Sequence, residues 1–91
     1  MSDSKKSPRY TLTHTFLPKY KIFGAGKDDS EELTLYDAMK KLSRSENRSK
    51  DSAHIQRSGR YVAFWSPWHN SFRPMKDATH DERANIEDDL F

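Results

Sequence analysis

The spacing of apolar residues changes twice along this chain, and this change restricts the fold more than any motif does. Residues 10–16 alternate Tyr, Leu, His and Phe with Thr, and residues 19–23 alternate again after Pro18. Between Leu35 and Leu42 the apolar residues instead lie three and four positions apart. A period of two is typical of strands, whereas a period near 3.6 is typical of a helix with one buried face. The pattern predicts strands, then a helix, then strands.

The other segments extend this order to β-β-α-β-β-α. Residues 17–19 are predicted to be the turn of a first hairpin, and Thr34 the N-cap of the helix. Residues 53–56 and 61–65 predict a second hairpin with Ser58-Gly59 in its turn. The segment between Pro67 and Pro74 is expected to be irregular and aromatic, and the tyrosines and tryptophans of this region could be core or exposed. Phe16, Ile22, Val62 and Phe64 are expected in the core.

A short acidic helix is predicted from His80 to about Asp88, because Thr79 and Glu82 have capping-box spacing. Its apolar face holds only Ala84, Ile86 and Leu90, so we expect it to be marginal. The fold class is therefore α+β: a small antiparallel sheet of two hairpins with one packed helix and a marginal C-terminal helix. The predicted organisation is a disordered arm at 1–8, one domain at 9–76 and an acidic helix or tail at 77–91.

The composition limits which kinds of site and which cellular location we expect for this chain. It has 91 residues, of which 33% are apolar, and no Cys, so disulfides and thiolate metal sites are excluded. Residues 1–8 lack the apolar stretch of a secretory signal, and the longest apolar run is Tyr61 to Trp65. We expect a cytoplasmic protein with no membrane partner. The small core is also consistent with a homodimer paired through the hairpin edge or residues 65–72.

Charge is sorted by position. Residues 1–76 carry 15 Lys and Arg against 8 Asp and Glu, whereas residues 77–91 carry only Arg83 against six acids. The net charges of +7 and −5 describe a basic body with an acidic end. A basic body attracts polyanions such as nucleic acid.

Motifs for catalysis or cofactor binding are absent from the sequence. The four histidines lack metal-site spacing, and Gly24-Ala25-Gly26-Lys27 lacks the phosphate-loop pattern and precedes Asp28-Asp29. No serine lies in a nucleophile elbow. We expect no enzyme activity, no metal and no cofactor.

Aromatic residues interleaved with cations instead suggest nucleic-acid binding. The ligand could be DNA or RNA, and single strands are among the candidates. Cations follow phosphates, and exposed rings stack on bases. The candidate residues are Lys19, Tyr20, Lys21, Arg57, Arg60, Tyr61, Trp68 and Arg73.

The acidic end has the chemistry of a portable ligand for a protein partner. The candidate partner-binding residues are Glu87, Asp88, Asp89, Leu90 and Phe91. This segment resembles the acidic tip of bacterial single-stranded-DNA-binding proteins, which recruits repair and replication enzymes. It is also similar to the clamp-binding pentapeptide, with Asp89-Leu90-Phe91 in the last three positions but Glu87 where that motif prefers Gln. Each resemblance covers about five residues; a frayed helix end with a chance Phe is the alternative.

The sequence therefore favours a small accessory protein that binds nucleic acid through a basic, aromatic sheet face. Its tail would compete for that face or dock a replication or repair protein. The alternative is an inhibitor or adaptor, of the kind found in phages and mobile elements, that binds a host enzyme and never contacts nucleic acid. Under either hypothesis, the short length of the chain and its lack of Cys suit a phage or mobile-element protein.

Overall fold

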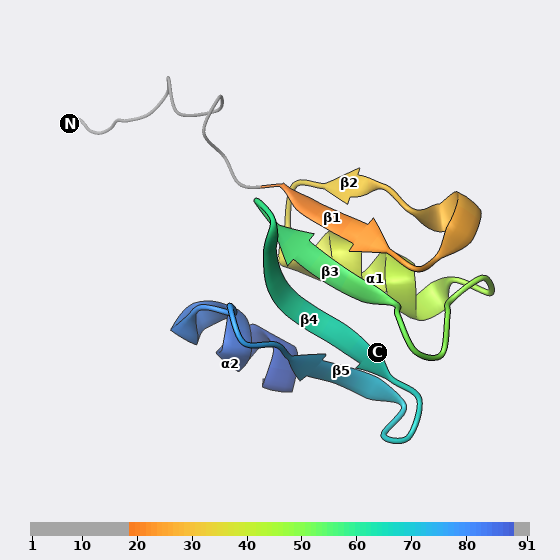
Figure 1. The fold of residues 1–91 in the computed structure, drawn as a ribbon. Coiled ribbons are helices and arrows are strands. Elements are labelled where there is room, and N and C mark those ends of the chain that lie inside the picture. Colours follow the sequence, from red (N-terminus) through yellow and green to blue (C-terminus); the bar gives the residue numbers. More distant parts are fainter. Residues whose placement is uncertain (1–18, 89–91) are drawn as a thin grey trace.

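The computed structural model describes residues 19–88, which form one antiparallel five-stranded sheet with two helices (Figure 1). The strand order is β2-β1-β3-β4-β5. In chain order the elements are β1 (Tyr20–Phe23), the 3-10 turn η2 (Gly26–Asp28), β2 (Glu31–Glu32), α1 (Leu35–Arg44), β3 (His54–Arg57), β4 (Arg60–Ser66), β5 (Ser71–Pro74) and α2 (His80–Asp88). The predicted α+β class is confirmed. The arm at 1–8, the strand at 10–16 and its turn, and residues 89–91 lie outside the described residues.

Both helices lie on one side of the sheet. Ile22 of β1 and Ile55 of β3 face each other in register and share a buried cluster with Met39 and Leu42 of α1 and Ile86 of α2. Figure 1 shows α1 beneath β1 and β3, with α2 running back alongside β5. Within residues 19–88 no helix covers the other side of the sheet, which we call the open face.

The predicted helix and its N-cap are confirmed in α1. The Asp37 N–H donates to Thr34 Oγ1 at 3.1 Å, which satisfies one of the free donors of the first turn. The four predicted core residues of this helix are all buried: Leu35, Ala38, Met39 and Leu42.

The second hairpin is confirmed, and it contains a bulge that the sequence pattern does not reveal. Ser58 and Gly59 have φ of 52° and 79°, as the tight turn requires. Between Ile55 and Gln56 the register shifts, so β4 has one extra residue and both Val62 and Ala63 are buried.

The bulge corrects the expectation that Phe64 lies in the core. After the extra residue the alternation along β4 is reversed, so Phe64 faces His54 on the open face and is 37% exposed. Trp65 takes the buried position instead.

Residues 71–74 are a strand, so the prediction of an irregular segment from Pro67 to Pro74 is wrong there. β5 pairs with β4, and the buried rings of Trp65 and Phe72 meet edge to face at 5.1 Å. Pro74 is tolerated because β5 ends there and lies at the sheet edge, where a missing N–H leaves no broken ladder bond. Only the turn at 67–70 is irregular, and Asn70 adopts a φ of 50° in it.

The acidic helix is confirmed, with the predicted capping box. The Glu82 N–H donates to Thr79 Oγ1 at 3.2 Å, and the Thr79 N–H donates to Glu82 Oε1 at 2.9 Å. Its buried residues differ from the expectation, because Ala84 is exposed and Glu82 is buried beside Ile86. A charged residue, not an apolar one, therefore faces the sheet in the first turn.

Glu82 joins α2 to the sheet through a fork of hydrogen bonds. Arg57 donates from Nε to Glu82 Oε2 at 2.7 Å and from Nη2 to Oε1 at 3.2 Å. The Tyr20 hydroxyl donates to Oε2 at 2.7 Å. Charge-assisted bidentate bonds of this kind are the strongest hydrogen bonds in proteins. They compensate for burying the carboxylate and fix α2 against β1 and β3.

The same contacts change how these groups titrate. Burial alone would raise the pKa of Glu82, but the bonds from Arg57, Thr79 and Tyr20 outweigh it and lower the pKa from 4.5 to about 2. Burial and the bond to Glu82 raise the pKa of the Tyr20 hydroxyl to about 12. Glu82 is therefore ionised in the folded protein at every pH at which most proteins function.

Glu82→Gln is expected to lower the free energy of unfolding at neutral pH by about 2–3 kcal/mol. Because the pKa of Glu82 is lower in the folded state, its contribution is complete above pH 4.5 and disappears as the pH falls toward about 2. Urea unfolding followed by circular dichroism across this range measures the effect. Asp81→Asn, at an exposed neighbour on α2, is the control and should change little. Equal acid sensitivity in wild type and Glu82→Gln would contradict this assignment.

Gly24 allows the 45–52 loop to pass close to β1. Its φ is +80°, and a Cβ there would lie 2.6 Å from the Ser52 carbonyl oxygen and 2.8 Å from Ala53 Cα. Its own carbonyl accepts from the Ser49 N–H at 2.7 Å. This close approach positions the loop that carries Lys50 and Asp51 beside the open face.

Gly24→Ala should destabilise the fold more than Gly59→Ala does, by about 2 kcal/mol or more. Gly59 has nearly the same φ, +79°, but nothing lies within 4 Å of a Cβ at that position. The matched pair separates backbone crowding from the cost of positive φ, which is about 1 kcal/mol at both sites. Urea midpoints of the two variants give the comparison; equal midpoints would show that the loop can move away.

Candidate nucleic-acid interface

The strand register aligns aromatic side chains in a row across the open face. Phe23 of β1 is opposite His54 of β3, His54 is opposite Phe64 of β4, and Phe64 is opposite Arg73 of β5. A second row places Lys21 opposite Gln56, and Gln56 opposite Tyr61. Directly opposed residues of an antiparallel pair share a face of the sheet. Four strands therefore contribute rings or cations to one surface.

The rings contact one another. Phe23 and His54 stack with centroids 5.1 Å apart and planes 11° apart, and His54 and Tyr61 lie 5.7 Å apart at 40°. His54 is held from both nitrogens: Nδ1 lies 2.7 Å from the Ser52 carbonyl oxygen and Nε2 lies 2.9 Å from Gln56 Nε2. Because a carbonyl can only accept, Nδ1 carries the proton in that bond. The row is therefore fixed before any ligand arrives.

Cations lie over the two outer rings of this series, Phe23 and Tyr61. Lys21 Nζ is 5.5 Å from the Phe23 ring centroid, and Lys76 Nζ is 5.6 Å from the Tyr61 centroid. Carboxylates are also near. Glu31 is opposite Lys21, Asp51 lies beside the row, and Asp77 Oδ2 accepts from the Tyr61 N–H at 2.9 Å. The surface is thus an aromatic platform on which cations and carboxylates occur in nearly equal numbers, not a strongly cationic patch.

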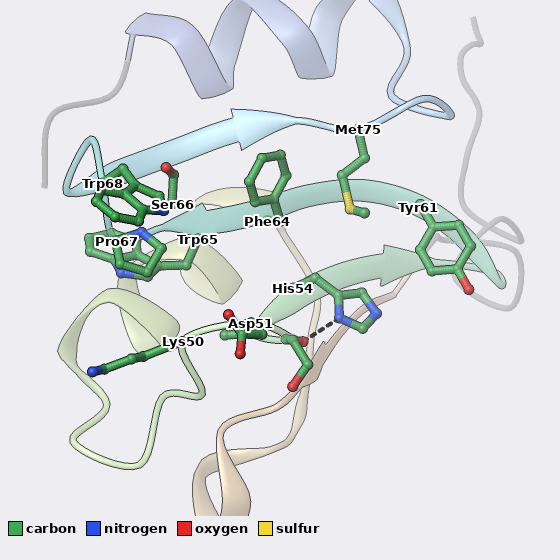
Figure 2. A pocket seen from close by; sticks show the side chains of 12 residues that line it. Lys50, Asp51, His54, Tyr61, Phe64, Trp65, Ser66, Pro67, Trp68 and Met75 are labelled. Carbon is green, nitrogen blue, oxygen red and sulfur yellow. Dashed lines mark hydrogen bonds between the residues drawn. The ribbon is translucent and has the colours of Figure 1, made fainter.

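A groove of about 550 Å³ runs along β4 on this face (Figure 2). Tyr61, Phe64 and Met75 lie at one part of it, and Trp68 with Pro67 at its other end. Its volume falls within the range of pockets that hold small organic groups, about 300–1,000 Å³. Trp68 is 95% exposed at the tip of the 67–70 turn, whereas Trp65 is 7% exposed. An almost fully exposed Trp beside a groove is unusual, because large apolar side chains are normally at least partly buried.

Six of the eight residues proposed from sequence for nucleic acid are exposed: Lys19, Lys21, Arg60, Tyr61, Trp68 and Arg73. Lys21, Tyr61 and Arg73 lie on the open face, and Trp68 lies at the end of its groove. Lys19 directly precedes β1, and Arg60 is the first residue of β4, where it pairs with Arg57. Tyr20 and Arg57 have a different place. They lie on the helix side, where both bond Glu82, so they form no part of the open face.

The acidic candidates are only partly described. Glu87 and Asp88 are exposed at the end of α2, while Asp89, Leu90 and Phe91 lie outside the described residues. Glu82, from the same acidic segment, pairs with Arg57 on the helix side of the sheet. Apart from Asp77, which accepts from the Tyr61 N–H, the described part of the acidic segment therefore lies away from the aromatic row.

Three residues of the row were missed from the sequence: Phe23, His54 and Phe64. The alternation in residues 19–23 does place Phe23 beside Lys21. His54 and Gln56 alternate with Ile55 in the same manner, which is the signal that could have found His54. Phe64 has no such signal, because the bulge at Val62 reverses the alternation.

Other kinds of site have less support in the described residues. Within residues 19–88 no three His, Cys, Asp or Glu side chains are close enough to hold a metal ion, and no helix there is long and apolar enough to cross a membrane. Comparisons with protein-family models, curated proteins and solved structures found no match.

The two tryptophans should report separately on the groove and the core. Trp68→Phe is expected to remove most of the fluorescence that iodide quenches, because the remaining Trp65 is 7% exposed. Trp65→Phe leaves Trp68 as the only indole and should give quenching close to that of free tryptophan. Stern–Volmer plots of the two variants test this, and equal quenching would mean that Trp68 is covered in solution.

Proposed function

We propose that this chain is a non-enzymatic accessory protein that binds single-stranded nucleic acid on the open face. Bases stack on Tyr61, Phe64 and Trp68, while phosphates lie near Lys21, Arg73 and Lys76. Stacking on aromatic residues of an exposed sheet is a recurrent way to bind single strands. The observation that carries the proposal is the pre-arranged row of rings with cations at its ends.

The chemistry of this surface favours single strands over duplexes. Rings fixed on a sheet reach the faces of unstacked bases, which a duplex hides. The few cations among several carboxylates offer contacts to about two to four phosphates, whereas non-specific duplex binders need more. Stacking would therefore supply most of the affinity.

In this proposal the acidic segment docks a protein partner. Of its two suggested roles, competition for the nucleic-acid surface has less support, because Glu82 holds α2 on the opposite side of the sheet. Glu87 and Asp88 are exposed and available to basic residues of a partner. A replication or repair protein fits this chemistry.

Tyr61→Ala and Phe64→Ala should each weaken binding of a labelled oligothymidine about 5- to 100-fold, the effect of losing one stacked base. The salt dependence should be shallow, with a log–log slope of about −1.5 to −3 for two to four phosphates at −0.7 each. Fluorescence anisotropy at several salt concentrations measures both. Leu33→Ala is the matched control, because Leu33 is 63% exposed but lies between β2 and α1. Absence of binding at low salt would refute the proposal.

A second candidate is a protein-binding inhibitor or adaptor, and the exposure of Trp68 favours it. Tryptophan is enriched among the residues that dominate protein interfaces, and Trp68 lies at the end of an aromatic groove. Such an interface would be almost insensitive to salt and would not bind oligonucleotides.

A further inference from the structure

A second groove also borders Trp65, and the charged side chains that line it are all cationic. It has a volume of about 480 Å³, and Lys40, Arg44 and Arg48 line it together with Trp65 and Asn70. No carboxylate lines it among the residues that the structure describes. The groove on the open face, in contrast, includes Asp51.

Arg48 lines this second groove and is held in place by hydrogen bonds. Its Nη1 donates to the carbonyls of Leu42, Ser43 and Ser45 at 3.2, 2.6 and 3.2 Å, which caps the end of α1. Its guanidinium also lies 4.3 Å from the Trp65 ring centroid. Arg48 already donates to three carbonyls, so Lys40 and Arg44 are the cations of this groove that remain for an anion. Both residues also line a neighbouring groove that includes Asp28, Glu32 and Asp37, and Lys40 Nζ lies 5.6 Å from the Tyr36 ring centroid. Arg44 is exposed and has no salt bridge to a described residue.

The two grooves meet at the end of β4. Trp65 lines both of them, and Asn70 of the second groove belongs to the turn that carries Trp68. In Figure 2, Trp65, Pro67 and Trp68 lie together at this end of the first groove. The end of the open-face groove beside Trp68 therefore borders the groove that Lys40 and Arg44 line.

We infer that the second groove binds the phosphates of a single strand that continues from the open face around the end of β4. This inference rests on the proposed function and extends it: the ligand is a strand longer than the open face can hold. The open face supplies stacking, and the α1 groove supplies the charge that the open face lacks. Affinity should then increase with oligonucleotide length beyond the open face.

Oligothymidines of about 4 and about 12 nucleotides, spanning the usual site sizes of small single-strand binders, separate the two surfaces. The longer oligonucleotide is expected to bind about tenfold more tightly. Replacing both Lys40 and Arg44 with Gln should abolish this gain and reduce the salt slope for the longer strand by about 1.4, the value for two phosphate contacts. Binding of the shorter strand should not change.

The control is Lys27→Gln with Lys41→Gln, which removes the same charge from residues that line neither groove. Equal losses in the two double variants, or no gain with length, would overturn the inference and leave the proposed function intact. Binding of an acidic peptide that depends on Lys40 and Arg44, with oligonucleotide binding unchanged, would also overturn it. Failure of even the shorter strand to bind wild type would refute both.

Discussion

The ion pair between Arg57 and Glu82 is the contact on which the arrangement of this molecule depends. α2 has little apolar surface to bury, and Ile86 is its one buried apolar residue. Glu82 compensates by entering the helix side of the sheet, where Arg57 and Tyr20 bond both of its oxygens. Burying a carboxylate costs free energy unless its oxygens are hydrogen-bonded, so the buried position of Glu82 depends on both Arg57 and Tyr20. This polar contact places an acidic helix on a basic sheet.

The same contact decides which charges are available to a ligand. Arg57 pairs with Glu82 within the fold, so its charge is not available to a ligand at the surface. The acids of α2 are brought to the helix side, which leaves the aromatic row uncovered by any described helix. The acids of α2 therefore lie on the helix side, whereas the open face has both cations and the carboxylates of Glu31, Asp51 and Asp77.

Much of the local structure was readable from residue patterns. The spacing from Leu35 to Leu42, the capping residues Thr34 and Thr79 and the Ser58-Gly59 turn each depend on neighbours within about four positions, and each is confirmed. The errors arose where distant contacts decide. Residues 71–74 form a strand because β4 offers a partner, and Phe64 is exposed because one bulge reverses the alternation after Val62.

The sequence by itself determined the α+β class, the helix and hairpin positions and the division between a basic body and an acidic end, because these follow from short-range periodicity and from counting charges. Only the tertiary structure decided which cations remain free and which rings share a face. Those properties depend on register and on pairs 25 or 62 residues apart in the chain, such as Arg57 with Glu82 and Tyr20 with Glu82. No local pattern encodes such pairs, since any of several arginines has the charge to meet that carboxylate and only packing selects one.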